Sequence, residues 1–117
     1  IAALPETDPE KLRRTGVLSL TEGERVARLH EKPENPQSNW ISPPLYFFQS
    51  SVTGVLEEFL KTPGNRDAPG YFIDYLAQAH RVDAFKINSG RFDIGCMESY
   101  RQADRELTGR LNFEKSE

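Results

Sequence analysis

The sequence contains a single cysteine, Cys96, among 117 residues. One cysteine excludes an internal disulfide and a cysteine-based zinc site, and it favours a reducing, cytoplasmic location. The chain has no run of lysine and arginine, and its formal net charge is −3, which disfavours binding to a nucleic-acid backbone. No apolar stretch approaches the roughly 20 residues that a membrane helix needs. We therefore expect neither nucleic acid nor membrane among its partners.

Several short catalytic motifs are also absent. The sequence has no P-loop, no dinucleotide-binding GxGxxG run and no GxSxG nucleophile motif. Its two histidines, His30 and His80, lie far apart with no third ligand beside them, which favours surface histidines over a metal pair. Any chemistry must therefore come from charged residues in other contexts.

The composition is that of a folded domain. Apolar residues make up 37% of the chain, charged residues 28% and aromatic residues 10%. This balance differs from that of disordered chains, and the length suffices for one domain with one core. The first residue is Ile1, not methionine, which suggests a piece of a longer chain or a processed product.

The first half of the chain predicts mainly strands. Residues 1–14 are charged and contain two prolines, so we expect an exposed lead-in or linker. Residues 15–20 and 25–30 are predicted as the strands of a hairpin. A loop with four prolines then fills residues 31–44, because proline fixes the backbone and lacks a donor. A short apolar strand is predicted at residues 45–48.

The second half predicts helices around short strands. Apolar residues at helical spacing begin at Val52, after Ser50 or Ser51 as cap, and a second helix is predicted over residues 69–79. The remaining expected elements are a strand at 82–87, a turn at 88–90, a short strand at 91–94, a helix over about 97–107 and a frayed tail at 111–117. Mixed strands and helices predict an α/β or α+β domain, with a mixed sheet and flanking helices.

Glu31-Lys32-Pro33 is the first segment with chemical content. An acid and a base at a strand end point to opposite faces, and the proline fixes the following loop. Such a lysine suits a phosphate group, and such a glutamate can accept hydrogen bonds from sugar hydroxyls. Taken alone, the tripeptide is more often a solvated charged loop, because exposed Glu and Lys are the default.

Phe92-Asp93-Ile94-Gly95 is the second segment with chemical content. It places a carboxylate between apolar residues, just before a predicted helix. That carboxylate is a hard oxygen ligand suited to Mg²⁺. Taken alone, it is more often a residue near a helix start that the helix dipole stabilises.

In this order and spacing the segments resemble the sugar-1-phosphate nucleotidylyltransferases, which act on glucose-1-phosphate or mannose-1-phosphate. The resemblance runs from Thr15 to about Glu106. It is carried by Glu31-Lys32-Pro33, Ser38-Asn39, Leu45-Tyr46-Phe47-Phe48, Asp67-Ala68-Pro69-Gly70-Tyr71-Phe72-Ile73 and Phe92-Asp93-Ile94-Gly95. It implies the C-terminal fragment of a Rossmann-like nucleotide-diphospho-sugar transferase fold, with residues 15–110 as the sugar-phosphate and metal-binding part. The family's glycine-rich nucleotide loop is absent from this sequence.

The resemblance also implies individual roles. Gly16 would let its backbone approach the sugar phosphate, Glu31 would bind sugar hydroxyls and Lys32 would contact the sugar-1-phosphate. Tyr46 would line the sugar pocket, and Arg66 or the aspartate after it would reach the substrate.

Asp93 would be one of two aspartates that hold Mg²⁺, so Lys32 and Asp93 are the expected catalytic residues. The complete enzyme would join a nucleoside triphosphate to a sugar-1-phosphate. One departure stands out: Pro44 occupies a position where the family usually has glycine, so a backbone donor is lost there.

Three alternatives remain at this stage. The parent protein is expected to be a nucleotidyltransferase, with the isolated 117 residues inactive. A non-catalytic regulatory or sugar-phosphate-sensing subunit of the same superfamily is the second possibility, and an unrelated α/β domain is the third. A part of such a fold would expose strand edges and helix faces, which predicts self-association as a homo-oligomer.

Overall fold

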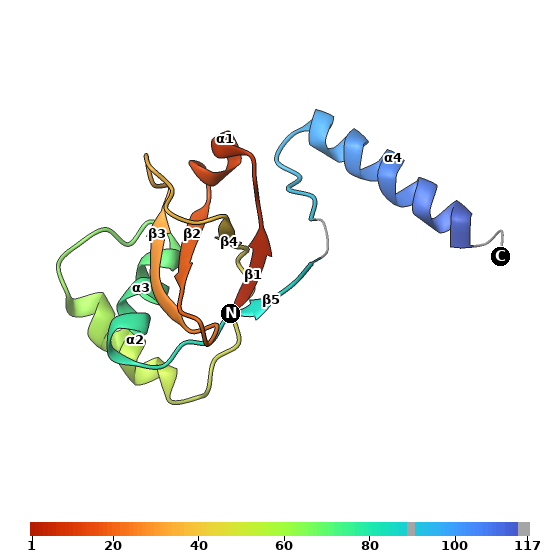
Figure 1. Cartoon of the computed structure of the whole chain (residues 1–117). Coiled ribbons are helices and arrows are strands. Elements are labelled where there is room, and N and C mark those ends of the chain that lie inside the picture. Colours follow the sequence, from red (N-terminus) through yellow and green to blue (C-terminus); the bar gives the residue numbers. More distant parts are fainter. Residues whose placement is uncertain (89–90, 115–117) are drawn as a thin grey trace.

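A five-stranded mixed sheet forms the centre of the computed structural model, which describes residues 1–88 and 91–114 (Figure 1). Antiparallel pairing joins all neighbours except the last pair, which is parallel. From edge to edge the strands are β3 (Val26–Glu31), β2 (Gly16–Leu20), β4 (Trp40–Ser42), β1 (Ala2–Pro5) and β5 (Phe85–Lys86). The mixed sheet with helices confirms the architecture expected from the sequence.

Within the described residues four helices accompany the sheet: α1 (Pro9–Leu12), α2 (Val52–Lys61), α3 (Pro69–Ala79) and α4 (Met97–Glu114). The bounds of α3 are those predicted, with Pro69 in its first turn and extended backbone at His80. The start of α2 is also confirmed, but the side chain of Ser51 makes no cap hydrogen bond. Figure 1 shows α2 and α3 on one side of the sheet, while α4 extends away from it. No helix among the described residues is long and apolar enough to cross a membrane.

The strands alternate their side chains between two apolar cores. Leu18 and Leu29 lie in the larger core, where Ile73 and Leu76 of α3 cover them. Val17 points to the other face, and it packs there with three buried residues, Leu4, Leu12 and Ile41. Burying a leucine or valine side chain stabilises the fold by roughly 1.5–3 kcal/mol, so this alternation fixes which face α3 occupies.

The expectation of an exposed lead-in at residues 1–14 is wrong. Residues 2–5 form β1, between β4 and β5, and Ala2, Ala3 and Leu4 are buried. The backbone N–H of Ala2 also donates to the carbonyl of Leu45 at 3.0 Å. Two alanines and a leucine carry too weak an alternation to stand out beside the prolines and charges that follow, although they are small enough to pack between neighbouring strands.

The strand expected at residues 45–48 is also wrong, because the strand lies earlier, at Trp40–Ser42. Pro43 and Pro44 follow β4 and cannot donate to a sheet ladder, so pairing stops at Ser42. Beyond the prolines the chain is irregular, and Phe47 is 80% exposed.

The C-terminal part differs from prediction in three places. The strand expected at 82–87 narrows to β5, and residues 91–94 form no strand. Helix α4 continues past Gly109 to Glu114, although it was expected to end there. A mid-helix glycine costs only about 1 kcal/mol, which strong helix formers around it can offset. The expected turn at 88–90 and tail at 111–117 extend outside the described residues.

An ion pair fastens α3 to the edge strand β3. Asp74 accepts hydrogen bonds from Nε of Arg28 at 2.8 Å, from Nη2 of Arg28 at 2.9 Å and from the backbone N–H of Leu29 at 2.9 Å. Burial by itself would raise the pKa of Asp74, but the hydrogen bonds from Arg28 and Leu29 outweigh it and lower that pKa. The ionised carboxylate of Asp74 therefore holds α3 against β3.

Replacing Asp74 by asparagine is expected to lower the free energy of unfolding by about 2 kcal/mol at pH 7, the scale of charge-assisted hydrogen bonds. Because the folded-state pKa lies below the unfolded one, this contribution exists above about pH 4 and is lost as the pH falls further. Urea unfolding at several pH values should show the two proteins converging in acid. Asp83→Asn is the matched control, since its pair with Arg81 is exposed. An equal loss in both variants would contradict the special role of Asp74.

The sheet edge and the irregular segment after Pro44 carry exposed aromatic residues. Phe85 on the edge strand β5 is 71% exposed and Phe47 is 80% exposed. Apolar groups beside an unpaired edge favour association. Light scattering of the 117-residue chain should therefore show a mass that rises with concentration. The double variant Phe47→Ser/Phe85→Ser should reduce that rise, whereas Leu60→Ser at the end of α2 should not. A monomer at all concentrations would contradict the expectation.

Candidate functional site

Three of the predicted site residues lie together at one end of the sheet: Gly16, Glu31 and Tyr46. Gly16 of β2 pairs with Glu31 of β3 on one side and with Ser42 of β4 on the other. Each of these paired residues lies two positions along its strand from a residue of the larger core: Leu18, Leu29 or Trp40. Side chains two positions apart share one face of a sheet, so the pairs lie on the face that α3 covers. We name Gly16, Glu31, Ser42, Tyr46 and Gly70 the glutamate cluster.

The Glu31 carboxylate lies directly over Gly16. A Cβ atom placed on Gly16 would be 3.5 and 3.6 Å from the two carboxylate oxygens and 3.1 Å from Cδ2 of Leu29. Gly16 is buried, so the half-buried carboxylate and Leu29 fill the place that a side chain would take. Glycine at this position lets the carboxylate approach the backbone of β2 closely.

Tyr46 approaches the same carboxylate from the loop after β4. Burial raises the pKa of Tyr46, the hydrogen bond with Ser42 lowers it, and the negative charge of Glu31 raises it further. The pKa ends above its usual range, so the phenol keeps its proton at neutral pH. The cluster thus offers one acceptor-only carboxylate and one neutral hydroxyl that can donate.

Lys32 follows Glu31 in an unusual backbone conformation. Its φ is 46°, in the left-handed region, and its N–H donates to the carbonyl of Thr15 at 3.0 Å. Pro33 favours extended backbone for the residue before it, so the left-handed value at Lys32 is not a consequence of that proline. The side chain of Lys32 is exposed. In sequence, Lys32 directly follows Glu31, the last residue of β3.

Arg66 is exposed in the loop between α2 and α3. In that loop, the N–H of Asp67 donates to Oδ1 of Asn65 at 3.1 Å, and Nδ2 of Asn65 donates to the hydroxyl of Tyr71 at 3.3 Å. The loop is thereby ordered where it enters α3. A substrate contact by Arg66 stays a prediction.

Asp93 lies in a different place from the glutamate cluster. It lines a cavity of about 570 Å³ with Lys11, Thr15, Ile41 and Arg91, beside the second core. Neither Glu31 nor Lys32 lines this cavity. Thr15 connects the two places, because it lines the cavity and its carbonyl accepts from Lys32.

The fit of Asp93 to Mg²⁺ is partial. Its side chain is 80% exposed, and Oδ2 lies 3.4 Å from Nη2 of Arg91. Within residues 1–88 and 91–114, no group of three or more potential His, Cys, Asp or Glu ligands gathers around one point. Mg²⁺ commonly takes one or two carboxylates and completes its shell with water and substrate phosphates. Asp93 therefore fits as one ligand of a site that needs others.

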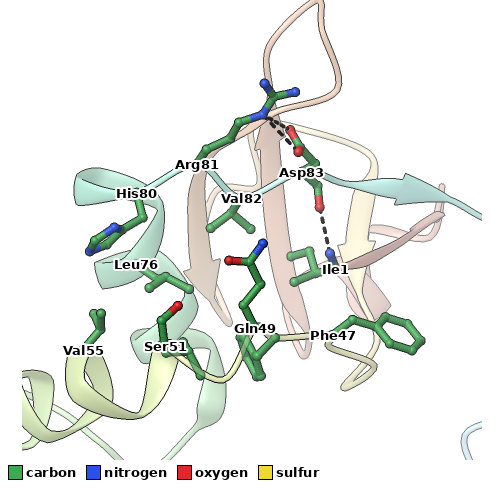
Figure 2. Close-up of a pocket in the computed structure, with 12 residues that line it drawn as sticks. Ile1, Phe47, Gln49, Ser51, Val55, Leu76, His80, Arg81, Val82 and Asp83 are labelled. Atoms are coloured by element: carbon green, nitrogen blue, oxygen red, sulfur yellow. Dashed lines mark hydrogen bonds and ion pairs between the residues drawn. The ribbon is translucent and has the colours of Figure 1, made fainter.

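A second cavity, of about 590 Å³, lies between the helices and the sheet edge, and Figure 2 shows its lining. Leu76 and Val82 form apolar wall, while Gln49 and His80 supply polar groups. Arg81 and Asp83 pair beside it at 2.9 Å. None of the predicted site residues lines this cavity.

Ser42 and Gly70 were missed by sequence reasoning. Ser42 carried no signal, because strand pairing with Gly16 brings it to the cluster, where it hydrogen-bonds Tyr46. Gly70 carried one: it is a glycine in the first turn of a helix, where its low helix propensity needs a reason. Close approach of another group is such a reason.

Comparison with known proteins places these observations in context. A family model described as nucleotidyl transferase matches residues 2–110. The glucose-1-phosphate adenylyltransferase of Thermomicrobium roseum is 31% identical over 111 residues, which cover 90% of this chain and 25% of that protein. The chain thus spans about a quarter of the length of such a curated relative.

Solved structures show the same fold. The crystal structure of an apo UDP-glucose pyrophosphorylase matches with a TM-score of 0.73 at 23% identity, covering 94% of this chain and 43% of that one. A UDP-glucose pyrophosphorylase complexed with UDP-glucose matches with a TM-score of 0.71 at 23% identity, covering 93% of this chain and 45% of that one. At this identity the likeness establishes the arrangement of helices and strands.

The left-handed conformation of Lys32 predicts an inverted preference between glycine and alanine. Lys32→Gly is expected to be more stable than Lys32→Ala by about 1 kcal/mol, because only glycine adopts this conformation without steric cost. Glu57, exposed within α2, is the control position, where the glycine variant should be the less stable one. Urea unfolding of the four variants checks both signs, and equal stability of the two Lys32 variants would contradict the assignment.

Proposed function

Because the chain belongs to the nucleotidyl transferase family, we propose that it forms the acceptor side of a sugar-1-phosphate nucleotidylyltransferase. The observation that supports this most directly is the glutamate cluster. Residues distant in sequence bring a carboxylate and a protonated phenol to one end of the sheet, where a buried glycine lets the carboxylate lie close to the backbone of β2. A lysine follows at the next position, and this combination suits a sugar joined to a phosphate.

The sugar would lie against the exposed side of the Glu31 carboxylate, with its hydroxyls donating to the carboxylate oxygens. A carboxylate accepts hydrogen bonds and cannot donate them, so it matches hydroxyl groups that act as donors. Tyr46 would supply the complementary donor from the side of Ser42.

The phosphate would be held by Lys32. An ammonium group on a flexible stem is a suitable point-charge partner for phosphate oxygens. The left-handed backbone at this position redirects the chain at the end of β3 and keeps the side chain exposed. Non-glycine residues in such conformations occur more often at functional sites, which is consistent with a binding role.

In the proposed reaction, a phosphate oxygen of the sugar-1-phosphate attacks the α-phosphorus of a nucleoside triphosphate. A new P–O bond forms, the bond to the β-phosphate breaks and pyrophosphate leaves. The nucleophile is already ionised at neutral pH, so no strong base is required, and positioning and charge compensation account for the catalysis. Lys32 would hold the attacking group, and Arg66 would reach the substrate from the loop before α3.

Asp93 would provide one carboxylate for Mg²⁺, whose charge would offset that of the phosphates. The other ligands, and the nucleotide-binding loop, would come from elsewhere in a longer protein. We propose that this chain follows that loop, as the C-terminal part of the catalytic domain. Curated relatives are about four times as long as the matched segment, which leaves room for such a part.

A non-catalytic sugar-phosphate sensor is the second candidate, and Pro44 favours it. Proline offers no N–H to a ligand, and the N–H of the following Leu45 turns back to donate to the carbonyl of Pro43 at 2.6 Å. The two backbone positions before Tyr46, Pro44 and Leu45, therefore have no free N–H to donate to a sugar. Reduced acceptor binding would suit a subunit that senses its ligand without turning it over.

The binding proposal can be tested on the chain itself. Glucose-1-phosphate should raise the thermal unfolding midpoint more than inorganic phosphate or glucose does. Lys32→Ala should weaken glucose-1-phosphate binding by about ten- to a hundredfold, the scale of a charge-assisted hydrogen bond. Lys61→Ala, an exposed lysine of α2, is the control and should bind normally. No difference between the sugar phosphate and inorganic phosphate would contradict the proposal.

The catalytic role needs the full-length protein. Asp93→Ala should abolish formation of the nucleotide sugar while leaving glucose-1-phosphate binding unchanged. Activity that persists in that variant would contradict the role of Asp93. Binding without any turnover in the unaltered protein would favour the sensor.

A further inference from the structure

Gly70 is buried in the first turn of α3, although its backbone does not require glycine. Its φ lies outside the left-handed region, as expected within a helix, where alanine would be favoured by about 1 kcal/mol. The explanation is therefore spatial. A group from another element must occupy the place where a side chain would begin.

That group is mainly the carboxylate of Glu31. A Cβ atom on Gly70 would lie 1.8 Å from Oε1 and 2.6 Å from Cδ of Glu31. It would also lie 2.6 Å from Cδ2 of Leu29, a core residue that is 3% exposed. Any side chain at position 70 must therefore displace the carboxylate, and it must also press on the core.

The place is electrostatically favourable for a carboxylate. The N-terminus of a helix carries partial positive charge, and the cap residue Ala68 provides no side chain to satisfy it. A purely structural role for Glu31, stabilising the start of α3, is therefore a real alternative. It differs from a binding role in one respect: it predicts a change in stability without a change in ligand selectivity.

We propose that Gly70 is a positioning residue that sets where the Glu31 carboxylate lies and thereby determines selectivity for the sugar part of the acceptor. This inference rests on the proposed function and extends it to a residue outside the expected site. A methyl group at position 70 displaces the carboxylate from the position in which it would accept hydrogen bonds from the sugar. Lys32, at the end of β3, keeps its contact with the phosphate.

The test is a double-mutant cycle in the full-length protein, with Gly70→Ala and Glu31→Ala made singly and together. Leu29→Val is included in all four proteins, because it removes the Cδ2 atom that would otherwise obstruct the new methyl group. Calorimetry then measures the affinities for glucose-1-phosphate and for inorganic phosphate, and thermal unfolding checks that each protein is folded.

Gly70→Ala should weaken glucose-1-phosphate binding about tenfold with Glu31 present and leave phosphate binding within twofold. With alanine at position 31, the same change should cost nothing in glucose-1-phosphate affinity, because no carboxylate remains to be displaced. An equal cost in both backgrounds would overturn the proposal, since Gly70 would then act independently of Glu31. So would an effect on stability alone, which would leave the structural role.

The control outcomes separate this inference from the proposed function. If Glu31→Ala weakens glucose-1-phosphate binding while Gly70→Ala does not, only the role of Gly70 fails. If Glu31→Ala has no effect, the proposed sugar contact fails, and the selectivity proposal fails with it.

Discussion

The attachment of α3 to β3 is the constraint on which the candidate site depends. Asp74 accepts both guanidinium hydrogen bonds of Arg28 and one from the backbone of Leu29, so helix and strand are fixed in register and distance. The distance is short because Gly70 has no side chain, which lets the first turn of α3 approach Glu31 and Leu29. A carboxylate half-buried at a helix start follows from these two facts. Its position is therefore a property of the packing and not of the Glu-Lys-Pro segment alone.

The candidate catalytic groups are divided between two faces of the sheet. Glu31 and Ser42 lie on the sheet face that α3 covers, while Asp93 lines a cavity with Ile41 and with Lys11 of α1. Lys32 and Thr15 lie where the two regions meet. The proposed reaction would need both regions, because the sugar phosphate and the metal would have to reach one phosphorus atom. The chain spans about a quarter of its curated relatives, and the groups that would complete such a centre are sought in the remainder.

Prediction from sequence succeeded where one local pattern dominated. The strong helical periodicity from Val52 and the proline at position 69 gave both α2 and α3 nearly to the residue. It failed where pairing with a distant segment decided the outcome. The strand at residues 2–5 exists because β4 and β5 flank it, and the strand expected at 45–48 lies instead at Trp40–Ser42, where it pairs with β1 and β2. Helix α4 continues past its internal glycine, Gly109, because the low helix propensity of glycine is only a weak preference.

The sequence by itself determined the class of fold, the family and the identity of the charged residues with chemical potential, because these depend on residue types in a fixed order. Only the tertiary structure decided which of them meet. It joined Gly16, Glu31 and Tyr46, added Ser42 and Gly70, and left Asp93 in a separate cavity. The physical reason is that strand register and helix approach are set by burial and by the absence of a Cβ atom. Both are relations between distant residues that no single segment contains.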